Sequence, residues 1–337
     1  MKITFDLVNC GLGNNGGSLT IVESAVELAK LGNVVTIIDS GRNKLTWTDL
    51  GSVNHIIIKD ERDIPDADVI VATGYKTVSH VCSLPRRCGI KFHWLRGWET
   101  WNYPEELIIS KILNTPTIKV VNGICLQEKL EKYNYSSYLI RPGYDIWDYF
   151  PLEFDGQRMK DVFIIGGLYN EGKKRSGKRT DWIFKCYEKL KDKDRFIQLF
   201  MFGSEGKPSN INCYHSNPDP ELKNKIYNMC SVWLAPTELE GLHIAPAEAM
   251  LTNCPVIGTN AEMSGMKDYL INGVNGLVSQ NDFDSFYQAL VTFYSFWKAN
   301  KLIDLFEERP RNTIMNLGTR RDNMIKFVEL FQKILGD

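Results

Sequence analysis

Short apolar segments alternate with helical stretches in both halves of the chain, and this pattern constrains the fold most. In the first half, residues 2–7 are expected to form a strand and residues 18–31 a helix. Further apolar runs lie at residues 34–38, 55–58, 69–73, 90–94 and 118–122. The second half repeats the pattern with strand candidates at 162–165, 197–202, 232–236 and 255–258 and a helix at 181–190. Such alternation is typical of a doubly wound α/β fold, in which helices cover both faces of a parallel sheet.

The alternation breaks once, at residues 141–151, whose sequence RPGYDIWDYFP is rich in turns and aromatic residues. Because 337 residues correspond to about two domains of ordinary size, we predict similar domains over residues 1–150 and 151–318. In the tail, residues 322–335 place apolar side chains at three- and four-residue steps. We therefore expect residues 319–337 to contain an amphipathic helix that buries this apolar face.

Composition narrows the function classes. The chain has 40 Lys and Arg against 41 Asp and Glu, a net charge of −1, so no nucleic-acid partner is expected. No apolar run approaches the roughly 20 residues that span a bilayer, and the start of the chain has no signal-peptide pattern. The 8 cysteines are scattered, without a C-x-x-C pair or zinc-binding spacing. Reduced thiols and a cytoplasmic location are therefore expected.

A glycine-rich loop follows the first predicted strand. Gly11, Gly13 and Gly16 match the pattern G-x-G-x-x-G, and Asp39 ends the second strand. In dinucleotide-binding folds such glycines let the backbone approach a pyrophosphate at a helix N-terminus. An NAD-dependent oxidoreductase is therefore one candidate, although Gly17 and three residues before Gly11 lengthen the loop.

A second candidate site lies after the strand that ends at residue 236. Glu240 and Glu248 flank seven residues, and a helix is expected to begin near Ala245. Backbone N–H groups at residues 241–244 would then face an anion, while the two carboxylates could accept hydrogen bonds from hydroxyls. A phosphate flanked by hydroxyls describes a nucleotide-sugar. A capped helix with exposed acids is the alternative, and spacing alone leaves both open.

The sequence of this block also resembles a known family. Residues 240–248 and the segment after them are similar to the E-x7-E block of the retaining family 4 (group 1) nucleotide-sugar glycosyltransferases. Gly16-Gly17, residues 141–151 and residues 271–278 resemble further motifs of that family, in the same order along the chain. The resemblance implies the GT-B fold, with two Rossmann-like domains that face each other across a cleft. It also implies that the tail helix returns to the N-terminal domain.

The resemblance assigns roles to particular residues. Glu240 would lie at the transferred sugar and Glu248 at the ribose, while Lys178, in the loop after the first strand of the second domain, would hold the diphosphate. The family usually has Arg where this chain has Gly167, so Arg175 or Lys173 is expected to substitute for it. The remaining donor-binding candidates are Gly16, Gly17, Gly167, Gly241, Leu242, His243 and Ile244. A solvated surface loop is the alternative for the basic residues of the loop, and for His243 the alternative is a role of its backbone N–H alone.

The segment 93–101 follows a strand of the first domain and contains three tryptophans. Ligands of α/β sheets bind beyond the carboxyl ends of strands, so Arg96, Trp98 and Glu99 are acceptor-binding candidates. His93 is assigned to the catalytic set, because related enzymes often have a pocket histidine there. Packing in the core is the alternative. Tyr214 and His215 lie where the nucleotide base would pack.

Together with these features, the resemblance implies a retaining, metal-independent glycosyltransferase without a cofactor. Its nucleoside-diphosphate sugar is a co-substrate, and its acceptor is a glycan, a lipid-linked molecule or a small molecule. Asp66-Ala67-Asp68 has the D-x-D pattern of metal sites, but we interpret it as the entry to a strand. Two rival functions stay open besides the capped-helix interpretation: the NAD-dependent oxidoreductase and a GT-B protein that has lost catalysis. Peripheral contact with a membrane also stays open.

Overall fold

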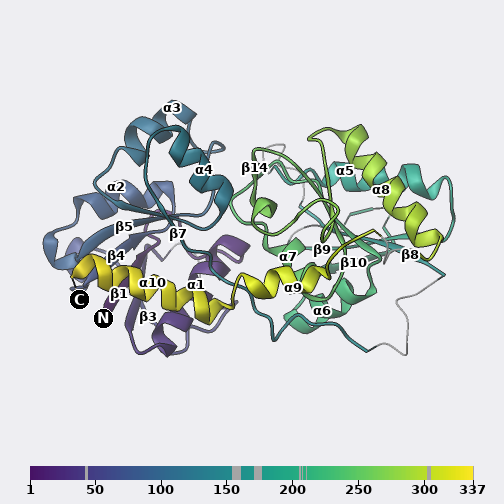
Figure 1. Ribbon diagram of the computed structural model, residues 1–337. Helices are drawn as coiled ribbons and strands as arrows, with labels where there is room; N and C mark the ends of the chain where they lie inside the picture. Colours follow the sequence, from purple (N-terminus) through teal and green to yellow (C-terminus); the bar gives the residue numbers. More distant parts are fainter. Residues whose placement is uncertain are drawn as a thin grey trace. The chain divides into compact units, whose positions relative to one another are not determined.

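The computed structural model describes residues 1–41, 45–153, 161–170, 177–204, 206, 208–209, 211–301 and 305–336 (Figure 1). The chain divides into two compact units. The N-terminal unit comprises residues Met1–Gly143 together with Arg320–Asp337, and the C-terminal unit comprises Tyr144–Thr319. The last helix of the chain therefore belongs to the same unit as the first strand.

The N-terminal unit alternates strands and helices, as the sequence predicts. Its strands are β1 (Lys2–Asp6), β2 (Val34–Asp39), β3 (Asn54–Ile57), β4 (Val69–Ala72), β5 (Ile90–Leu95), β6 (Ile118–Val121) and β7 (Tyr138–Leu139). Its helices are α1 (Gly16–Lys30), α2 (Tyr75–Ser83), α3 (Glu105–Leu107), α4 (Ile124–Lys132) and α10 (Arg320–Leu335), with the short turns η1 (Glu61–Asp63), η2 (Arg86–Cys88) and the π-helical η3 (Ile108–Leu113).

All seven strands of this unit form one parallel sheet in the order β3-β2-β1-β4-β5-β6-β7. Helices α1 and α10 pack together on one face of it (Figure 1). The apolar face of α10 is buried there, since Phe327 stacks edge-on against Trp94 at 5.2 Å and Phe331 against Phe92 at 4.8 Å between ring centroids. This contact explains the spacing of apolar residues in the tail.

The C-terminal unit repeats the design. Its strands are β8 (Phe163–Leu168), β9 (Ile197–Gly203), β10 (Cys213–Ser216), β11 (Val232–Ala235), β12 (Leu239–Glu240), β13 (Val256–Thr259), β14 (Met263–Ser264) and β15 (Leu277–Ser279). Its helices are α5 (Thr180–Lys191), α6 (Pro220–Met229), α7 (Ile244–Leu251), α8 (Phe283–Lys298) and α9 (Pro310–Asn316), with the 3-10 turn η4 (Gly265–Asp268).

Six of these strands form a parallel sheet in the order β10-β9-β8-β11-β13-β15, and β12 pairs with β14 apart from it. One buried apolar cluster contains residues of α6 and α7, and the other contains residues of α5 and α8. The prediction of two parallel α/β sheets is therefore confirmed. Strand β10 was not expected from the sequence, because only four residues at the sheet edge form it.

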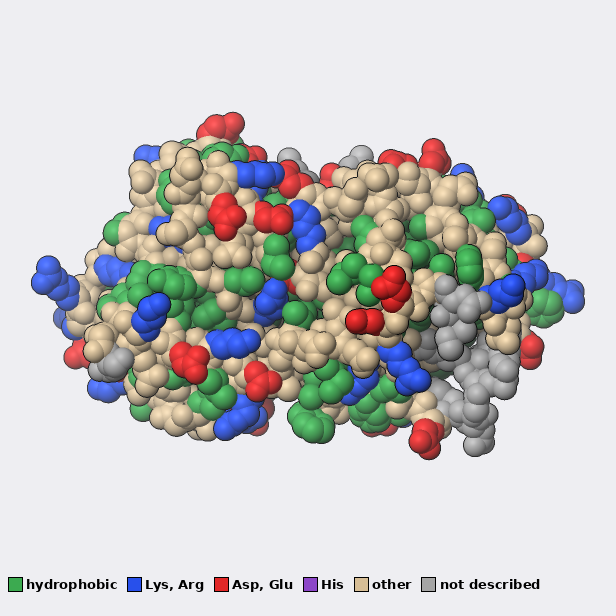
Figure 2. All heavy atoms as spheres, in the orientation of Figure 1, with side chains coloured by type: hydrophobic (Ala, Val, Ile, Leu, Met, Phe, Trp, Pro, Cys, Tyr) green, Lys and Arg blue, Asp and Glu red, His purple; other side chains and the backbone are tan. Residues whose placement is uncertain are grey.

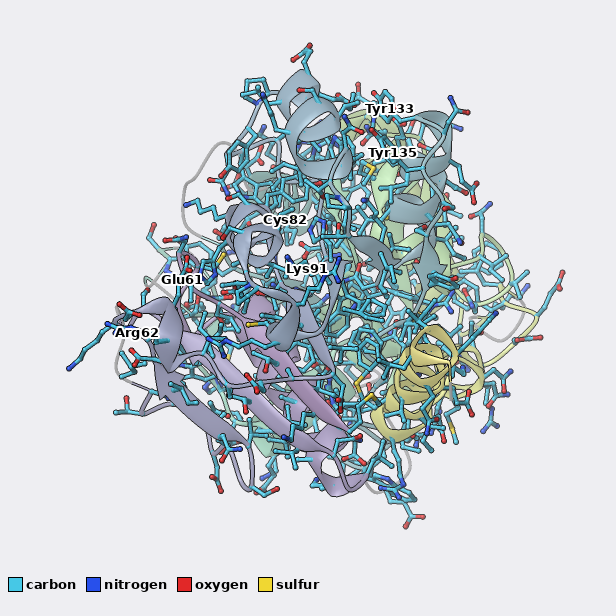
Figure 3. The ribbon with its side chains drawn as sticks, turned by 90° about the vertical axis from the view of Figure 1, so that its left-hand side faces the viewer. Glu61, Arg62, Cys82, Lys91, Tyr133 and Tyr135 are labelled. Carbon is cyan, nitrogen blue, oxygen red and sulfur yellow. The ribbon has the colours of Figure 1, made fainter. Side chains whose placement is uncertain are left out.

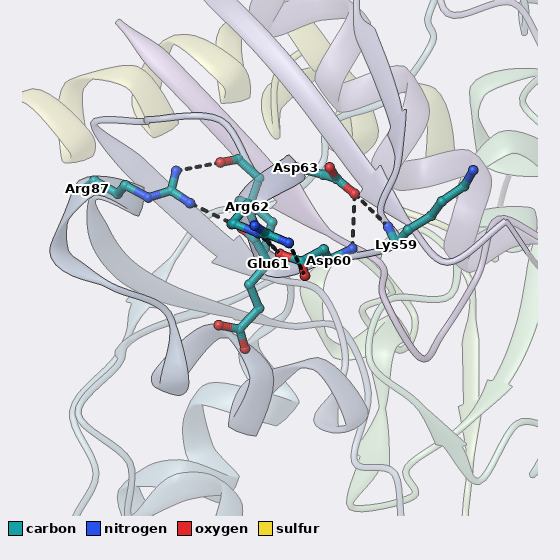
Figure 4. Close-up of polar contacts among 7 residues, drawn as sticks. Lys59, Asp60, Glu61, Arg62, Asp63 and Arg87 are labelled. Atoms are coloured by element: carbon teal, nitrogen blue, oxygen red, sulfur yellow. Dashed lines mark hydrogen bonds and ion pairs between the residues drawn. The ribbon is translucent and has the colours of Figure 1, made fainter.

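Two polar clusters show how loops of the N-terminal unit are held. Lys91 donates from Nζ to the carbonyl oxygens of Cys82 and Leu84, at 2.8 and 2.6 Å, and so satisfies the C-terminal end of α2 (Figure 3). Asp63 accepts from the backbone N–H groups of Lys59 and Asp60 and closes the turn η1 (Figure 4). Both arrangements satisfy backbone groups that a helix end leaves unpaired.

On the face of the molecule in Figure 2, Lys and Arg side chains lie interspersed with Asp and Glu, in keeping with the net charge of −1. Within the described residues, no helix is long and apolar enough to cross a bilayer.

Candidate functional site

The loop between β11 and α7 carries most of the predicted donor-binding residues. It leaves the carboxyl end of β11, pairs briefly with β14 through β12, and enters α7 at Ile244. A Cβ atom added at Gly265 would lie 2.6 Å from the Cα atom of Leu242 and 2.7 Å from the backbone nitrogen of His243. The glycine therefore lets η4 pack directly on the backbone of this loop and fixes its path.

The loop before α5 approaches the same place. Gly177 has a φ of +64°, and because it has no side chain its backbone packs closely against Leu239. An added Cβ atom would lie 2.7 Å from the Cβ atom of Leu239. Its carbonyl accepts from the N–H of Glu238 at 2.7 Å. Arg179, in the left-handed conformation at the start of α5, forms an ion pair of 2.8 Å with Glu238. These contacts hold Lys178 beside β12.

Lys178 and Glu240 therefore meet. Lys178 Nζ lies 3.5 Å from Glu240 Oε2, and about a quarter of each side chain is exposed, 25% and 27%. Glu240 precedes α7, which begins at Ile244, and the charge of Lys178 acts on His243, the N-cap of that helix, where the helix dipole is positive. The prediction that Lys178 lies in a strand-to-helix loop agrees with the structure. Arg175 and Lys173, the predicted substitutes for the missing arginine, lie outside the described residues.

Glu248 lies one turn into α7, as the spacing predicts. It accepts a hydrogen bond at 2.7 Å from the hydroxyl of Tyr227, which comes from α6. Burial raises the pKa of Tyr227 well above its usual value, and the neighbouring Glu248 adds to the effect. The phenol is therefore a fixed donor that holds the orientation of the carboxylate. Sequence reasoning missed Tyr227, because it lies 21 residues before its partner on another helix.

His243 is buried at the start of α7, with 4% of its surface exposed. Its Nδ1 lies 3.0 Å from the hydroxyl oxygen of Thr237, which is fully buried. Tyr269 donates from its hydroxyl to the backbone carbonyl of His243. Burial lowers the pKa of His243 well below its usual value, and the charge of Lys178 lowers it further. The imidazole is therefore neutral near pH 7.

Gly167 lies inside β8, one residue before the end of the strand, rather than in the loop. A Cβ added there would lie 2.7 Å from Cδ1 of Ile183 on α5. The position therefore faces the packed helix, and a longer side chain would have to displace Ile183. The contact with Ile183 is therefore a local reason for glycine at position 167.

The N-terminal unit brings four predicted residues together at the carboxyl ends of its strands. Arg96 donates to the carbonyl of Gly17 at 2.5 Å and to the carbonyl of Thr73 at 2.7 and 3.2 Å. Glu99 accepts from the backbone N–H of Tyr75 at 3.1 Å, at the start of α2. Burial raises the pKa of Glu99 and lowers that of Arg96 to about 10. Gly16, the first residue of α1, has open space where a Cβ would point.

His93 and Trp98 lie deeper. His93 on β5 is fully buried, and within the described structure neither ring nitrogen has a hydrogen-bond partner. Burial and the charges of Lys119 and Arg96 lower its pKa to about 3. Trp98 is 3% exposed and stacks on Tyr133 with the ring planes 1° apart. Both side chains pack in the interior of the N-terminal unit.

The remaining candidates occupy structural positions. Asp39, the acid of the dinucleotide-binding pattern, is fully buried and lies 3.6 Å from Nε2 of His55. Asp68 accepts from the backbone N–H of Lys2, and Asp66 pairs with Arg87, which also holds the turn η1 through the carbonyl of Glu61 (Figure 4). Asp66 and Asp68 thus hold the entry to β4, as expected.

Two further predictions concern metal ligands and the contacts of the nucleotide base. Among the residues that the structure describes, no group of three or more His, Cys, Asp or Glu side chains is placed to hold a metal ion. Tyr214 and His215, the predicted base contacts, lie on the edge strand β10. Tyr214 packs edge-on against Tyr169, and His215 Nε2 lies 3.2 Å from the sulfur of Cys213.

Solved structures with the same architecture are glycosyltransferases of the GT-B class. HepE of Anabaena matches with a TM-score of 0.80 and 11% identity, over 99% of this chain and 100% of that chain. Sucrose-phosphate synthase of Thermosynechococcus elongatus matches with a TM-score of 0.77 and 12% identity, over 100% and 99%. A glycosyltransferase of Rickettsia africae matches with a TM-score of 0.74 and 16% identity, over 99% and 98%. The predicted GT-B fold is thus confirmed.

Residues 160–295 match the family model of the glycosyl transferases group 1. This part of the chain is a group 1 glycosyltransferase domain, and the protein is a glycosyltransferase. No curated protein matches the sequence.

Proposed function

We propose that the protein is a retaining, metal-independent glycosyltransferase that moves a sugar from a nucleoside-diphosphate sugar to a hydroxyl group of an acceptor. The observation that carries this proposal is the contact between Lys178 Nζ and Glu240 Oε2, 3.5 Å apart at the N-terminal end of α7. A cation, a carboxylate and a helix N-terminus at one point suit a substrate that combines an anionic phosphate with sugar hydroxyls.

The chemistry assigns a task to each group. As the bond to the sugar breaks, negative charge develops on the departing diphosphate, and Lys178 and the dipole of α7 stabilise it. Glu240 accepts a hydrogen bond from a hydroxyl of the transferred sugar. Glu248, oriented by Tyr227, accepts one from the ribose. All these groups belong to the C-terminal unit, which therefore holds the donor.

Two further assignments support the choice of substrates. HepE was solved in complex with UDP-glucose, which makes UDP-sugars the first donors to test. We assign the acceptor, a glycan, a lipid-linked molecule or a small molecule, to the N-terminal unit, where Arg96 and Glu99 supply polar contacts. A cytoplasmic location is proposed because all eight cysteines are free thiols.

The decisive experiment is a donor panel. Purified protein is incubated with UDP-, GDP-, ADP- and dTDP-sugars, with and without EDTA, and release of the nucleoside diphosphate is measured. We expect one donor to be hydrolysed slowly without acceptor, and EDTA to leave the rate unchanged. NMR of the transfer product should then show the anomeric configuration of the donor.

Other results would separate the alternatives. Binding of a donor without any release would indicate a GT-B protein that has lost catalysis. Loss of release with EDTA, restored by Mg²⁺ or Mn²⁺, would refute metal independence. Inversion of the anomeric centre would refute the retaining mechanism. Thermal stabilisation by NAD alone would favour the oxidoreductase alternative.

A further inference from the structure

Only one of the two ring nitrogens of His243 has a hydrogen-bond partner among the described residues. Its Nδ1 contacts the hydroxyl of Thr237 at 3.0 Å, whereas its Nε2 is buried and has no hydrogen-bond partner among the described residues. A buried polar atom without a partner costs about 1–3 kcal/mol, so native structures contain few of them. Because Nε2 lies beside the proposed donor-binding loop, its missing hydrogen-bond partner points to a group of the bound ligand.

The hydroxyl of Thr237 fixes which nitrogen carries the proton. Thr237 is fully buried, and within the described structure His243 is the partner of its hydroxyl group. If Nδ1–H donated to the hydroxyl oxygen, the hydroxyl hydrogen would be buried without an acceptor. If the hydroxyl donates to Nδ1, its hydrogen is used, and the proton of the neutral ring lies on Nε2. The second arrangement leaves one group unsatisfied instead of two.

Two backbone contacts hold the ring in place. Thr259 donates from its hydroxyl to the carbonyl of Thr237 at 2.8 Å, and Tyr269 donates to the carbonyl of His243. Thr237 follows β11 and Thr259 ends β13, so the imidazole is anchored at the carboxyl edge of the sheet, where ligands of α/β folds bind. Lys178 is near enough for its charge to act on the imidazole.

We propose that His243 donates an Nε2–H hydrogen bond to the diphosphate of the nucleotide-sugar, and that Thr237 is the positioning residue that fixes this tautomer. The inference rests on the proposed function, because it assigns the contact to that donor. A neutral donor suits this place, since Lys178 already supplies a positive charge and a buried imidazolium beside it would be costly. Phosphate oxygens, which only accept hydrogen bonds, match a ring that presents only a donor.

NMR of the wild-type protein with ¹⁵N-labelled histidine side chains tests the tautomer directly. The chain has 5 histidines, and the signals missing from the His243→Gln variant identify the ring. We expect the Nε2–H tautomer in the free protein and a shift of the Nε2–H proton when UDP or GDP is added. A proton on Nδ1, or an Nε2 signal that does not change while the nucleotide binds, would overturn the proposal.

Variants then measure the contact by isothermal titration calorimetry with the same nucleotides. His243→Leu removes the donor and should raise the Kd about 10- to 100-fold, as expected for a hydrogen bond to a charged group. His243→Gln keeps an N–H group at a similar distance from the backbone and should stay within about 5-fold of wild type. Equal affinity of all three proteins would contradict the proposal.

Thr237→Val tests the positioning role. It should raise the Kd less than His243→Leu does, by about 3- to 10-fold, and should let the NMR signals report a mixture of tautomers. Thr252→Val is the matched control, because Thr252 is equally buried but lies at the other end of α7. An unchanged tautomer in Thr237→Val would refute the role of the hydroxyl.

Different results would refute the proposed function and the role of His243. If the wild-type protein binds neither UDP nor GDP and releases neither from any sugar donor, the proposed function fails. If the wild type binds UDP or GDP but His243→Leu binds it equally well while remaining folded, only the inference about His243 fails. The NMR measurement on the wild type needs no variant to fold.

Discussion

The two units use the same design, a strand, a glycine loop and a helix, but they use their charged residues differently. In the N-terminal unit, Arg96 donates to the backbone carbonyls of Gly17 and Thr73, and Glu99 accepts from the first N–H of α2. In the C-terminal unit, Lys178 and Glu240 contact each other and remain partly exposed. Arg96 and Glu99 are thus tied to backbone groups of their own unit, whereas Lys178 and Glu240 keep about a quarter of each side chain exposed, as the proposed donor site requires.

The largest effect is expected from removing the charged side chains of Lys178 and Glu240 in the C-terminal unit. Lys178→Ala and Glu240→Ala should each lower kcat about 10²- to 10³-fold, because each removes a group that we propose to act on the departing phosphate or on the sugar. The measurement is donor turnover with saturating acceptor. Lys185→Ala is a suitable control, since Lys185 pairs with Asp181 on the exposed surface of α5. Turnover near that of the wild type in both variants would refute the assignment of the site.

Gly265→Ala tests whether the path of the loop matters as much as its charges. The new Cβ would lie 2.6 Å from the Cα atom of Leu242, so the backbone of the loop must shift. We expect a loss of about 1–3 kcal/mol in stability and weaker donor binding. Urea unfolding and calorimetry measure the two effects. Gly273→Ala, whose Cβ would meet nothing within 4 Å, is the control for stability, with a penalty for its φ of +75° alone. A Gly265→Ala protein as stable as the wild type would show that the close approach is unimportant.

Arg96→Ala tests the N-terminal half of the comparison. It removes three hydrogen bonds to backbone carbonyls and should destabilise the N-terminal unit by about 1.5–3 kcal/mol. Because the donor site lies in the C-terminal unit, affinity for the nucleotide should be preserved. Urea unfolding and calorimetry with UDP or GDP separate these outcomes. Unchanged stability with a large loss of nucleotide affinity would mean that Arg96 serves the ligand rather than the fold.

Tyr227→Phe should have a smaller effect, because it removes one hydrogen bond to Glu248 and leaves the carboxylate in place. A single hydrogen bond contributes about 0.5–1.5 kcal/mol, so we expect the KM for the donor to rise about 2- to 10-fold with little change in kcat. Steady-state kinetics measures both constants. The opposite pattern, a lower kcat with the same KM, would contradict an orienting role in donor binding.

Patterns with local causes could be predicted from the sequence. Most of the longer strands follow from apolar runs, whereas the short edge strand β10 does not. The spacing of Glu240 and Glu248 places them around a strand-to-helix loop, but their roles and that of Lys178 came from the family resemblance. Contacts between distant segments could not be predicted, such as Tyr227 with Glu248 or Thr237 with the ring of His243, because periodicity carries no information about which helices meet. The aromatic segment misleads for the same reason: Trp98 suggests a sugar platform, yet its ring stacks on Tyr133 of α4.

The smallest expected effect concerns a buried pair in the N-terminal unit. His80 Nδ1 lies 2.5 Å from Asp6 Oδ2. The hydrogen bond to Asp6 raises the pKa of His80 above its usual value, and burial raises the pKa of Asp6. Both folded-state values are raised, so the folded protein binds protons more tightly than the unfolded chain. The stability from His80 is therefore complete below about pH 6.5 and is lost as the pH rises through its folded pKa.

His80→Gln should flatten this dependence. We expect the Tm of the wild type to fall between pH 6 and pH 8 by about 2 °C more than that of the variant, since the variant lacks the titrating ring. The variant is less stable at both pH values, because Asp6 keeps a weaker partner, so the slopes rather than the absolute Tm values decide. Parallel Tm curves would show that the His80–Asp6 pair does not titrate in this range and that its role, unlike that of Lys178 and Glu240, is purely structural.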